Sequence, residues 1–175
     1  MDKKKEVIIM AIIAIVVVII AIIAIFMNGG AISQAQQKKY VNSIEEEADQ
    51  IKKSEMKDFN KIDIDKYLDL YKGKDESIVM IGRTDCEFCP IAEPILKNIA
   101  HLYDLDINYL SLDTFDDKDR EKLLKSDKYF EELGGVETPM ILIVKDKKII
   151  DHTEGLYSGK EYTQFFIDNS IIEIK

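Results

Sequence analysis

Hydrophobic residues are distributed unevenly along this chain, and the densest run lies near the amino terminus. From Val7 to Met27 every residue is apolar, and most are Ile, Val or Ala. At about 1.5 Å rise per residue, a helix over this run reaches roughly 30 Å, the thickness of the hydrocarbon core of a bilayer. A helix that is apolar on all sides needs lipid or a large core to cover it. The run therefore predicts a transmembrane anchor at residues 7–27.

The charges beside this run predict its orientation. Lys3, Lys4 and Lys5 precede it, and lysine-rich flanks tend to stay on the cytoplasmic side. We therefore expect residues 1–6 to form a cytoplasmic tail and the chain after the anchor to lie outside the cytoplasm. A cleaved signal peptide is the alternative, because Ser33-Gln34-Ala35 has the small-residue spacing of a cleavage site. The apolar core of a signal peptide is usually only about 7–15 residues long.

Residues 28–60 are mostly polar and predict a stalk that is partly helical. A narrow apolar stripe recurs there at steps of three and four, at Val41, Ile44, Ala48 and Ile51. One interpretation is a spacer helix whose stripe rests on the following domain or on nothing. The other is self-association, for which about two heptads is a short run.

From residue 61 to residue 175 the pattern is that of one domain in which helices and strands alternate. The apolar spacing predicts helices over 64–72, 86–103, 117–133 and 160–171, and strands over 77–82, 107–112, 140–144 and 148–152. Asp63 and Gly73 bracket the first of these helices as its caps. The alternation is typical of an α/β domain in which helices pack on a central sheet.

Composition narrows the classes of partner. The formal net charge is −9, from 24 basic and 33 acidic residues. Nucleic-acid binding requires clustered positive charge, so we expect no nucleic-acid partner. The same balance argues against a domain that lies flat on an anionic membrane surface.

The only two cysteines lie three residues apart, in Cys86-Glu87-Phe88-Cys89, where a predicted strand gives way to a predicted helix. At this spacing two sulfurs can form and break a disulfide with little backbone movement. Unpaired N–H groups and the dipole at a helix start stabilise a thiolate, which attacks a substrate disulfide before the second thiol resolves the intermediate. We therefore expect Cys86 to be the nucleophile, Cys89 the resolving thiol, and no cofactor beyond this redox-active pair.

Two other uses of a cysteine pair at this spacing are a zinc site and a structural disulfide. A zinc site needs two more ligands, and the only histidines, His101 and His152, are not spaced as such ligands usually are. An inert structural disulfide suits an exported protein, but closing so short a loop stabilises a fold little.

The order of elements, with Cys86 and Cys89 at the head of a helix, resembles the thioredoxin fold, a central mixed β-sheet flanked by helices. Pro94 matches the helix proline of that family, Thr138-Pro139 its cis-proline before a strand, and Gly155 the glycine that lets a substrate backbone approach. The resemblance covers roughly residues 61–175. It implies a thiol–disulfide oxidoreductase in which Thr138, Pro139 and Gly155 bind substrate. Pro139 also suits a strand start, because it cannot donate to a ladder.

Two positions depart from that family. Met80 stands where thioredoxins carry a buried aspartate, and Asp85 where they carry a tryptophan. The usual internal proton acceptor is therefore missing, and Glu87 is either a substitute acting through water or a solvated carboxylate at the helix start. Asp85 and Glu87 disfavour ionisation of the Cys86 thiol, and Arg83 lies close enough in sequence to oppose them. The expected result is a reducing pair.

Two local sequence motifs, Cys-Glu-Phe-Cys-Pro and later Gly-Gly-Val-Glu-Thr-Pro, look most like those of the membrane-anchored or exported thioredoxin-like proteins of low-GC Gram-positive bacteria. The bacteriocin transport accessory proteins belong to that group. The resemblance implies an anchored reductant of protein or peptide disulfides, served by an unidentified electron-transfer partner. Two alternatives stay open: a reductant dedicated to cytochrome c maturation, and an accessory module that holds a peptide, such as a bacteriocin, in the same groove.

Overall fold

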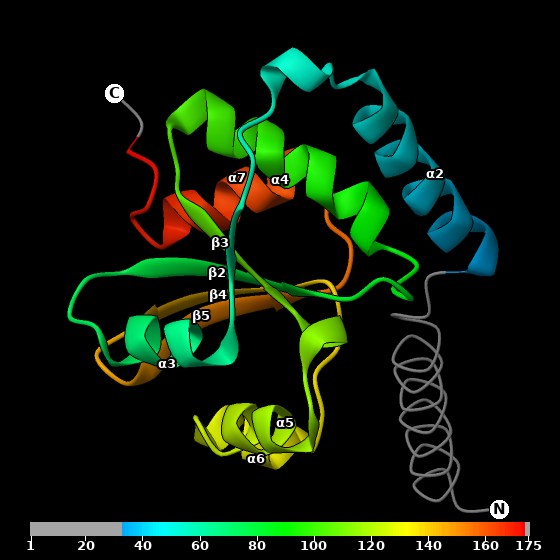
Figure 1. Cartoon of the computed structure of the whole chain (residues 1–175). Coiled ribbons are helices and arrows are strands. Elements are labelled where there is room, and N and C mark those ends of the chain that lie inside the picture. The colour runs from blue at the N-terminus through cyan, green and yellow to red at the C-terminus, as the bar shows by residue number, and fades with distance from the viewer. Residues whose placement is uncertain (1–32, 174–175) are drawn as a thin grey trace, which may run out of the picture. The chain divides into compact units, whose positions relative to one another are not determined.

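The fold is known from a computed structural model that describes residues 33–173 (Figure 1). Val41–Lys175 forms one compact unit, to which the following description applies. The anchor predicted at residues 7–27 lies outside the described residues. Among the helices that are described, none has the length and apolar character needed to cross a membrane.

A five-stranded mixed sheet lies at the centre of this unit, in the strand order β1-β3-β2-β4-β5. The strands β1 (Asn60–Ile62) and β2 (Ser77–Gly82) run parallel to β3 (Ile107–Ser111), which lies between them. β4 (Met140–Lys145) is antiparallel to β2 and to β5 (Lys148–Glu154). The predicted α/β class with a central mixed sheet is confirmed, although β1 was not predicted.

Helices cover both faces of the sheet (Figure 1). One face carries α4 (Cys89–Tyr103) and α7 (Gly159–Asp168), and the other carries α3 (Ile64–Lys72), α5 (Asp117–Leu124) and α6 (Lys128–Leu133). Two short 3₁₀ helices lie in connections: η1 (Lys53–Glu55) precedes β1, and η2 (Leu112–Thr114) lies between β3 and α5.

The side chains of β2 alternate between the two cores. Ile78 and Met80 pack beneath α4 and α7, while Val79 and Ile81 pack against α3, α5 and α6. A strand that is buried on both faces must be apolar at every position, which explains why β2 is an unbroken hydrophobic run.

Several helix boundaries differ from those predicted. The single helix expected over 117–133 is two helices, because Asp127 is extended (φ −142°) and its side chain accepts a hydrogen bond from the Tyr129 N–H to begin α6. α4 begins at Cys89 rather than at Cys86. The Asp63 cap is confirmed, since its side chain accepts from the Lys66 N–H.

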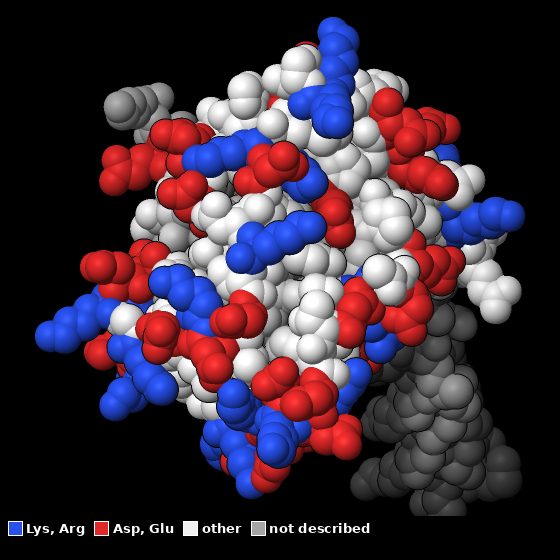
Figure 2. Space-filling model, viewed as in Figure 1, with Lys and Arg blue, Asp and Glu red and all other residues white. Residues whose placement is uncertain are grey.

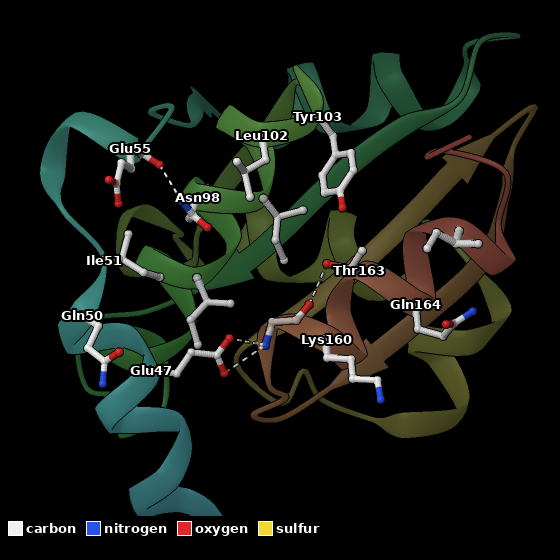
Figure 3. Close-up of a pocket in the computed structure, with 14 residues that line it drawn as sticks. Glu47, Gln50, Ile51, Glu55, Asn98, Leu102, Tyr103, Lys160, Thr163 and Gln164 are labelled. Carbon is white, nitrogen blue, oxygen red and sulfur yellow. Dashed lines mark hydrogen bonds between the residues drawn. The ribbon is translucent and has the colours of Figure 1, made fainter. Parts of the chain in front are cut away.

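The apolar stripe of α2 (Gln34–Gln50) rests on the domain. Ile44 is 1% exposed and Ala48 is 7% exposed, and both belong to the core beneath α4 and α7. Between them, the Glu47 carboxylate accepts hydrogen bonds of 3.2 and 3.3 Å from the Gly159 N–H at the first residue of α7 (Figure 3). Residues 41–50, which the sequence assigns to a stalk, are therefore packed as part of the domain.

A pocket of about 540 Å³ lies where α2, α4 and α7 meet (Figure 3). Its lining includes the exposed side chains of Leu102 and Tyr103 on α4, and Asn98, which donates a hydrogen bond to the Glu55 carbonyl at 2.9 Å. None of the predicted site residues lines this pocket. The candidate chemistry lies elsewhere, at the end of β2.

Candidate active site

The end of β2 and the start of α4 hold the two cysteines. β2 ends at Gly82 and α4 begins at Cys89, so Cys86 lies in the connecting turn and Cys89 in the first helical turn. The two are joined by a disulfide, with their Cα atoms 5.4 Å apart. Cys86 is 5% exposed and Cys89 2% exposed. The sequence predicted the pair correctly but placed Cys86 inside the helix.

The start of α4 is directed at the sulfur of Cys86. The Cys89 N–H donates a hydrogen bond of 3.0 Å to the Cys86 Sγ atom. Phe88, the residue that precedes the helix, has no side-chain group to accept from these N–H donors. The Cys86 sulfur therefore takes the place of a capping side chain, where the helix dipole and a free donor both favour negative charge.

The charges that flank Cys86 are partly paired with one another. The Arg83 Nε atom lies 3.0 Å from the Asp85 Oδ1 atom, and both side chains are largely exposed. An exposed pair of this kind contributes at most about 1 kcal/mol, but it reduces the field of Asp85 at the sulfur. Glu87 is exposed and forms no ion pair within residues 33–173. It is thus the one unpaired carboxylate beside Cys86 in the described part of the chain.

Asp113 in η2 fixes the turn that precedes Cys86. The Thr84 N–H lies 3.1 and 3.0 Å from its two carboxylate oxygens, and the Thr84 hydroxyl donates at 3.0 Å. The backbone hydrogen bond from Thr84 holds the pKa of the Asp113 carboxyl below its usual value. Sequence reasoning missed this contact. The only indication of this contact in the sequence is that Asp113 lies shortly after β3, the strand that pairs with β2.

The residues predicted to bind substrate lie at the start of β4 and just after β5. The Thr138–Pro139 bond is cis, as expected, and the Gly155 N–H donates to the Pro139 carbonyl at 2.8 Å. Gly155 has φ 89°, a conformation that favours glycine, and a Cβ atom there would meet nothing within 4 Å. The space above Gly155 is therefore open. β5 extends to Glu154, two residues beyond its predicted end, and this extension carries the chain to Pro139.

A carboxylate that the sequence did not single out lies one turn beyond Cys89. Glu93 follows it by four residues, so the two share a face of α4. Tyr109 is the partner of the fully buried Met80 across β2 and β3. Burial, and then the negative charges of Glu93 and Asp113, raise the pKa of Tyr109 to about 12. The Tyr109 side chain therefore lies close to both Glu93 and Asp113.

Solved structures resemble this arrangement at the level of the fold. No family model matches the chain, and no curated protein matches it. Thioredoxin f2 of Chlamydomonas reinhardtii superposes with a TM-score of 0.51 and 12% identity, over 66% of this chain and 100% of that one. A thioredoxin of Trypanosoma brucei brucei gives 0.50 and 11%, over 66% and 93%. At such identity the likeness establishes the fold alone.

The chain therefore has the thioredoxin fold, as the sequence predicted. The fold carries a disulfide between Cys86 and Cys89 where β2 meets α4. This pair, joined to this fold, supports activity as a thiol–disulfide oxidoreductase.

Proposed function

We propose that the protein is a membrane-anchored thiol–disulfide oxidoreductase that acts outside the cytoplasm and reduces disulfides of proteins or peptides. The observation that carries the proposal is the hydrogen bond from the Cys89 N–H to the Cys86 Sγ atom. It prepares one sulfur as a thiolate and keeps the second sulfur within bonding reach.

The reaction proceeds by two exchanges. The Cys86 thiolate attacks one sulfur of the substrate disulfide, forms a mixed disulfide and releases the other substrate sulfur as a thiolate, which takes up a proton. Cys89 then loses its proton and attacks the Cys86 sulfur, which re-forms the Cys86–Cys89 disulfide and releases the second substrate thiol. Two electrons pass to the substrate. A dithiol electron donor, the unidentified partner, returns the pair to its reduced state.

Thr138, Pro139 and Gly155 serve as the substrate-binding edge. The backbone N–H and C=O of Thr138 make no hydrogen bond to other residues in the described part of the chain. Groups left free in this way can pair with an extended substrate as a short added strand. The open space above Gly155 leaves room for the substrate backbone.

The surroundings of Cys86 favour a reducing role. Because Arg83 pairs with Asp85, Glu87 is the charge left to oppose the helix dipole. Glu87 offsets part of the stabilisation that the helix start gives to the Cys86 thiolate, and we expect a potential nearer the roughly −270 mV of thioredoxin than the about −120 mV of a strong oxidant. Equilibration of the full chain with glutathione or dithiothreitol measures it. A value above about −180 mV would contradict the reducing role.

The activity itself is tested by blocking the cysteines. The reduced full chain is expected to accelerate the reduction of insulin by dithiothreitol, and the same chain alkylated at Cys86 and Cys89 is expected to have no effect. If the intact protein reduced insulin and the alkylated protein still bound a peptide partner, the chain would be a holding module as well as an oxidoreductase. Unreduced insulin with the intact protein would contradict the proposed function.

A further inference from the structure

A second pocket lies beside the turn that leads to Cys86. Its volume is about 390 Å³, and its lining includes five apolar side chains, Leu112, Phe115, Leu123, Leu124 and Val136. Gly134 and Gly135 also line it, and a Cβ atom at either would meet nothing within 4 Å. The pocket is therefore open where these glycines lie, and apolar side chains form part of its wall.

The polar side chains that line this pocket are both arginines, which are rare in this chain. The sequence contains only two arginines, Arg83 and Arg120, and both line the pocket, while every other basic side chain is a lysine. Arg83 is paired with Asp85. The Arg120 side chain forms no ion pair or hydrogen bond with any residue between 33 and 173, although the chain has 33 acidic residues. One planar cation is thus left without a carboxylate partner at the pocket.

The pocket borders the predicted substrate-binding edge. The Cys86 N–H approaches the Arg83 carbonyl at 3.4 Å, so Arg83 belongs to the same turn as the nucleophile. Val136, on another wall, precedes Thr138 by two residues. A polypeptide that pairs with Thr138 and presents its disulfide to Cys86 therefore passes this pocket.

We propose that the Arg83–Arg120 pocket binds a segment of the protein substrate in which a carboxylate lies next to an apolar side chain, near the substrate cysteine. This inference rests on the proposed oxidoreductase function and names its substrate class. Guanidinium groups match carboxylates in shape and charge. The apolar wall requires an apolar group to displace water from it, which an inorganic anion does not supply.

Exchange rates with a matched pair of peptides test this specificity. Each peptide is a disulfide-linked dimer whose cysteine is flanked by leucine and either glutamate or the isosteric glutamine. We expect the reduced full chain to react about fivefold faster with the glutamate peptide at low salt, and the ratio to fall toward one in about 0.5 M salt. Arg120→Gln is expected to lower the ratio to below about twofold. Lys118→Gln, which removes the same charge from α5 outside the pocket, should keep it.

Equal rates with the two peptides would overturn the inference and leave the oxidoreductase function standing. Failure to react with either would instead contradict the proposed function. Binding of the peptides to the pocket is measured separately from disulfide exchange, with peptides that carry serine in place of cysteine.

These serine peptides are titrated into the oxidised full chain in detergent, and the amide NMR signals of Gly134 and Gly135 are followed. The glutamate peptide should shift both signals, and the glutamine peptide and the Arg120→Gln variant should give little change. No shift with the glutamate peptide would refute the inference. Inorganic phosphate is added as the competing anion. Equal shifts from phosphate would reduce the pocket to a general anion site and refute the assignment to a polypeptide.

Discussion

Cys86 and Cys89 occupy different surroundings although they lie three residues apart. The Cys86 sulfur lies before α4 and accepts a hydrogen bond from the N–H of Cys89, the first residue of the helix, whereas Cys89 lies within α4. A sulfur that accepts a hydrogen bond from a helix start carries negative charge more readily than one inside the helix. We therefore expect Cys86 to attack the substrate and Cys89 to resolve the mixed disulfide.

Single-cysteine variants test this assignment. We expect Cys89→Ser to accumulate a mixed disulfide between Cys86 and the substrate, because nothing remains to release it. Cys86→Ser should accumulate none. Gel electrophoresis without reductant, followed by mass spectrometry of the adduct, distinguishes the two. Trapping by Cys86→Ser alone would reverse the roles.

Glu93 lies one helical turn after Cys89 on the same face of α4, and its side chain lies close to Tyr109. We expect it to act as the proton acceptor of Cys89 during resolution. We expect Glu93→Gln to slow the release of the mixed disulfide at pH 7 by about 10²-fold, within the range for general base catalysis. Above the usual thiol pKa of about 8.5 the variant and the wild type should converge, because the thiol then ionises unaided.

Stopped-flow measurement of substrate release between pH 6 and 10 checks this expectation, with Glu87→Gln as the matched variant. Parallel profiles for Glu93→Gln and the wild type would show that Glu93 takes no proton. A slow rate in Glu87→Gln with a normal Glu93→Gln would instead assign the role to Glu87.

At the residue scale, the sequence predicted those features that depend on local order. The cysteine pair and the cis bond before Pro139 both belong to motifs a few residues long. The Thr84–Asp113 contact joins residues 29 apart, and the Arg83–Asp85 pair depends on side-chain rotamers. Neither leaves a periodic signal, so neither could be predicted from one sequence.

At the scale of elements, the missed features are short or polar. β1 has only three residues, and Asn60 and Lys61 in it are exposed, so it shows no apolar alternation. The division between α5 and α6 rests on Asp127, whose capping role was hidden in a continuous helical pattern. The long apolar strands β2 and β4 were predicted almost to the residue, because burial on both faces leaves few alternatives.

α2 shows how packing decides between interpretations that sequence leaves open. Its two buried residues contribute to the same core as α4 and α7, and Glu47 caps α7. A side-chain cap of a helix start is worth about 1 kcal/mol. The helix is therefore part of what stabilises the domain rather than a passive spacer.

Ile44→Ala measures this contribution. The side chain is 1% exposed, so we expect the free energy of unfolding to fall by about 2–5 kcal/mol. Ile150→Ala is the matched control, because Ile150 is 47% exposed and loses little by truncation. Urea unfolding of both full-length variants gives the comparison. Equal small losses would mean that α2 stabilises nothing and would return it to the role of a spacer.

At the scale of the whole molecule, the charge balance is acidic. Acidic and basic side chains alternate over one face of the structure (Figure 2), and the chain as a whole carries −9. Such a surface keeps a protein soluble and supplies no broad field to attract nucleic acid. On this background, the local charge of Arg83 and Arg120, rather than the field of the whole chain, would have to select the acidic segment proposed above.

The same scale includes the position of the chain at the membrane. The proposed anchor at residues 7–27 and the lysines before it would place the domain outside the cytoplasm. Protease added to intact cells stripped of their wall should therefore remove the domain, whereas a carbonate wash should not. Replacing Lys3, Lys4 and Lys5 with glutamine should increase the protected fraction, because the orienting charge is lost while Lys38 and Lys39 remain. A soluble product that begins after residue 35 would show instead that the apolar run is a cleaved signal peptide. An exported domain without an anchor would still meet disulfides in an oxidising compartment, so this outcome would change its location and leave the chemistry of Cys86 and Cys89 standing.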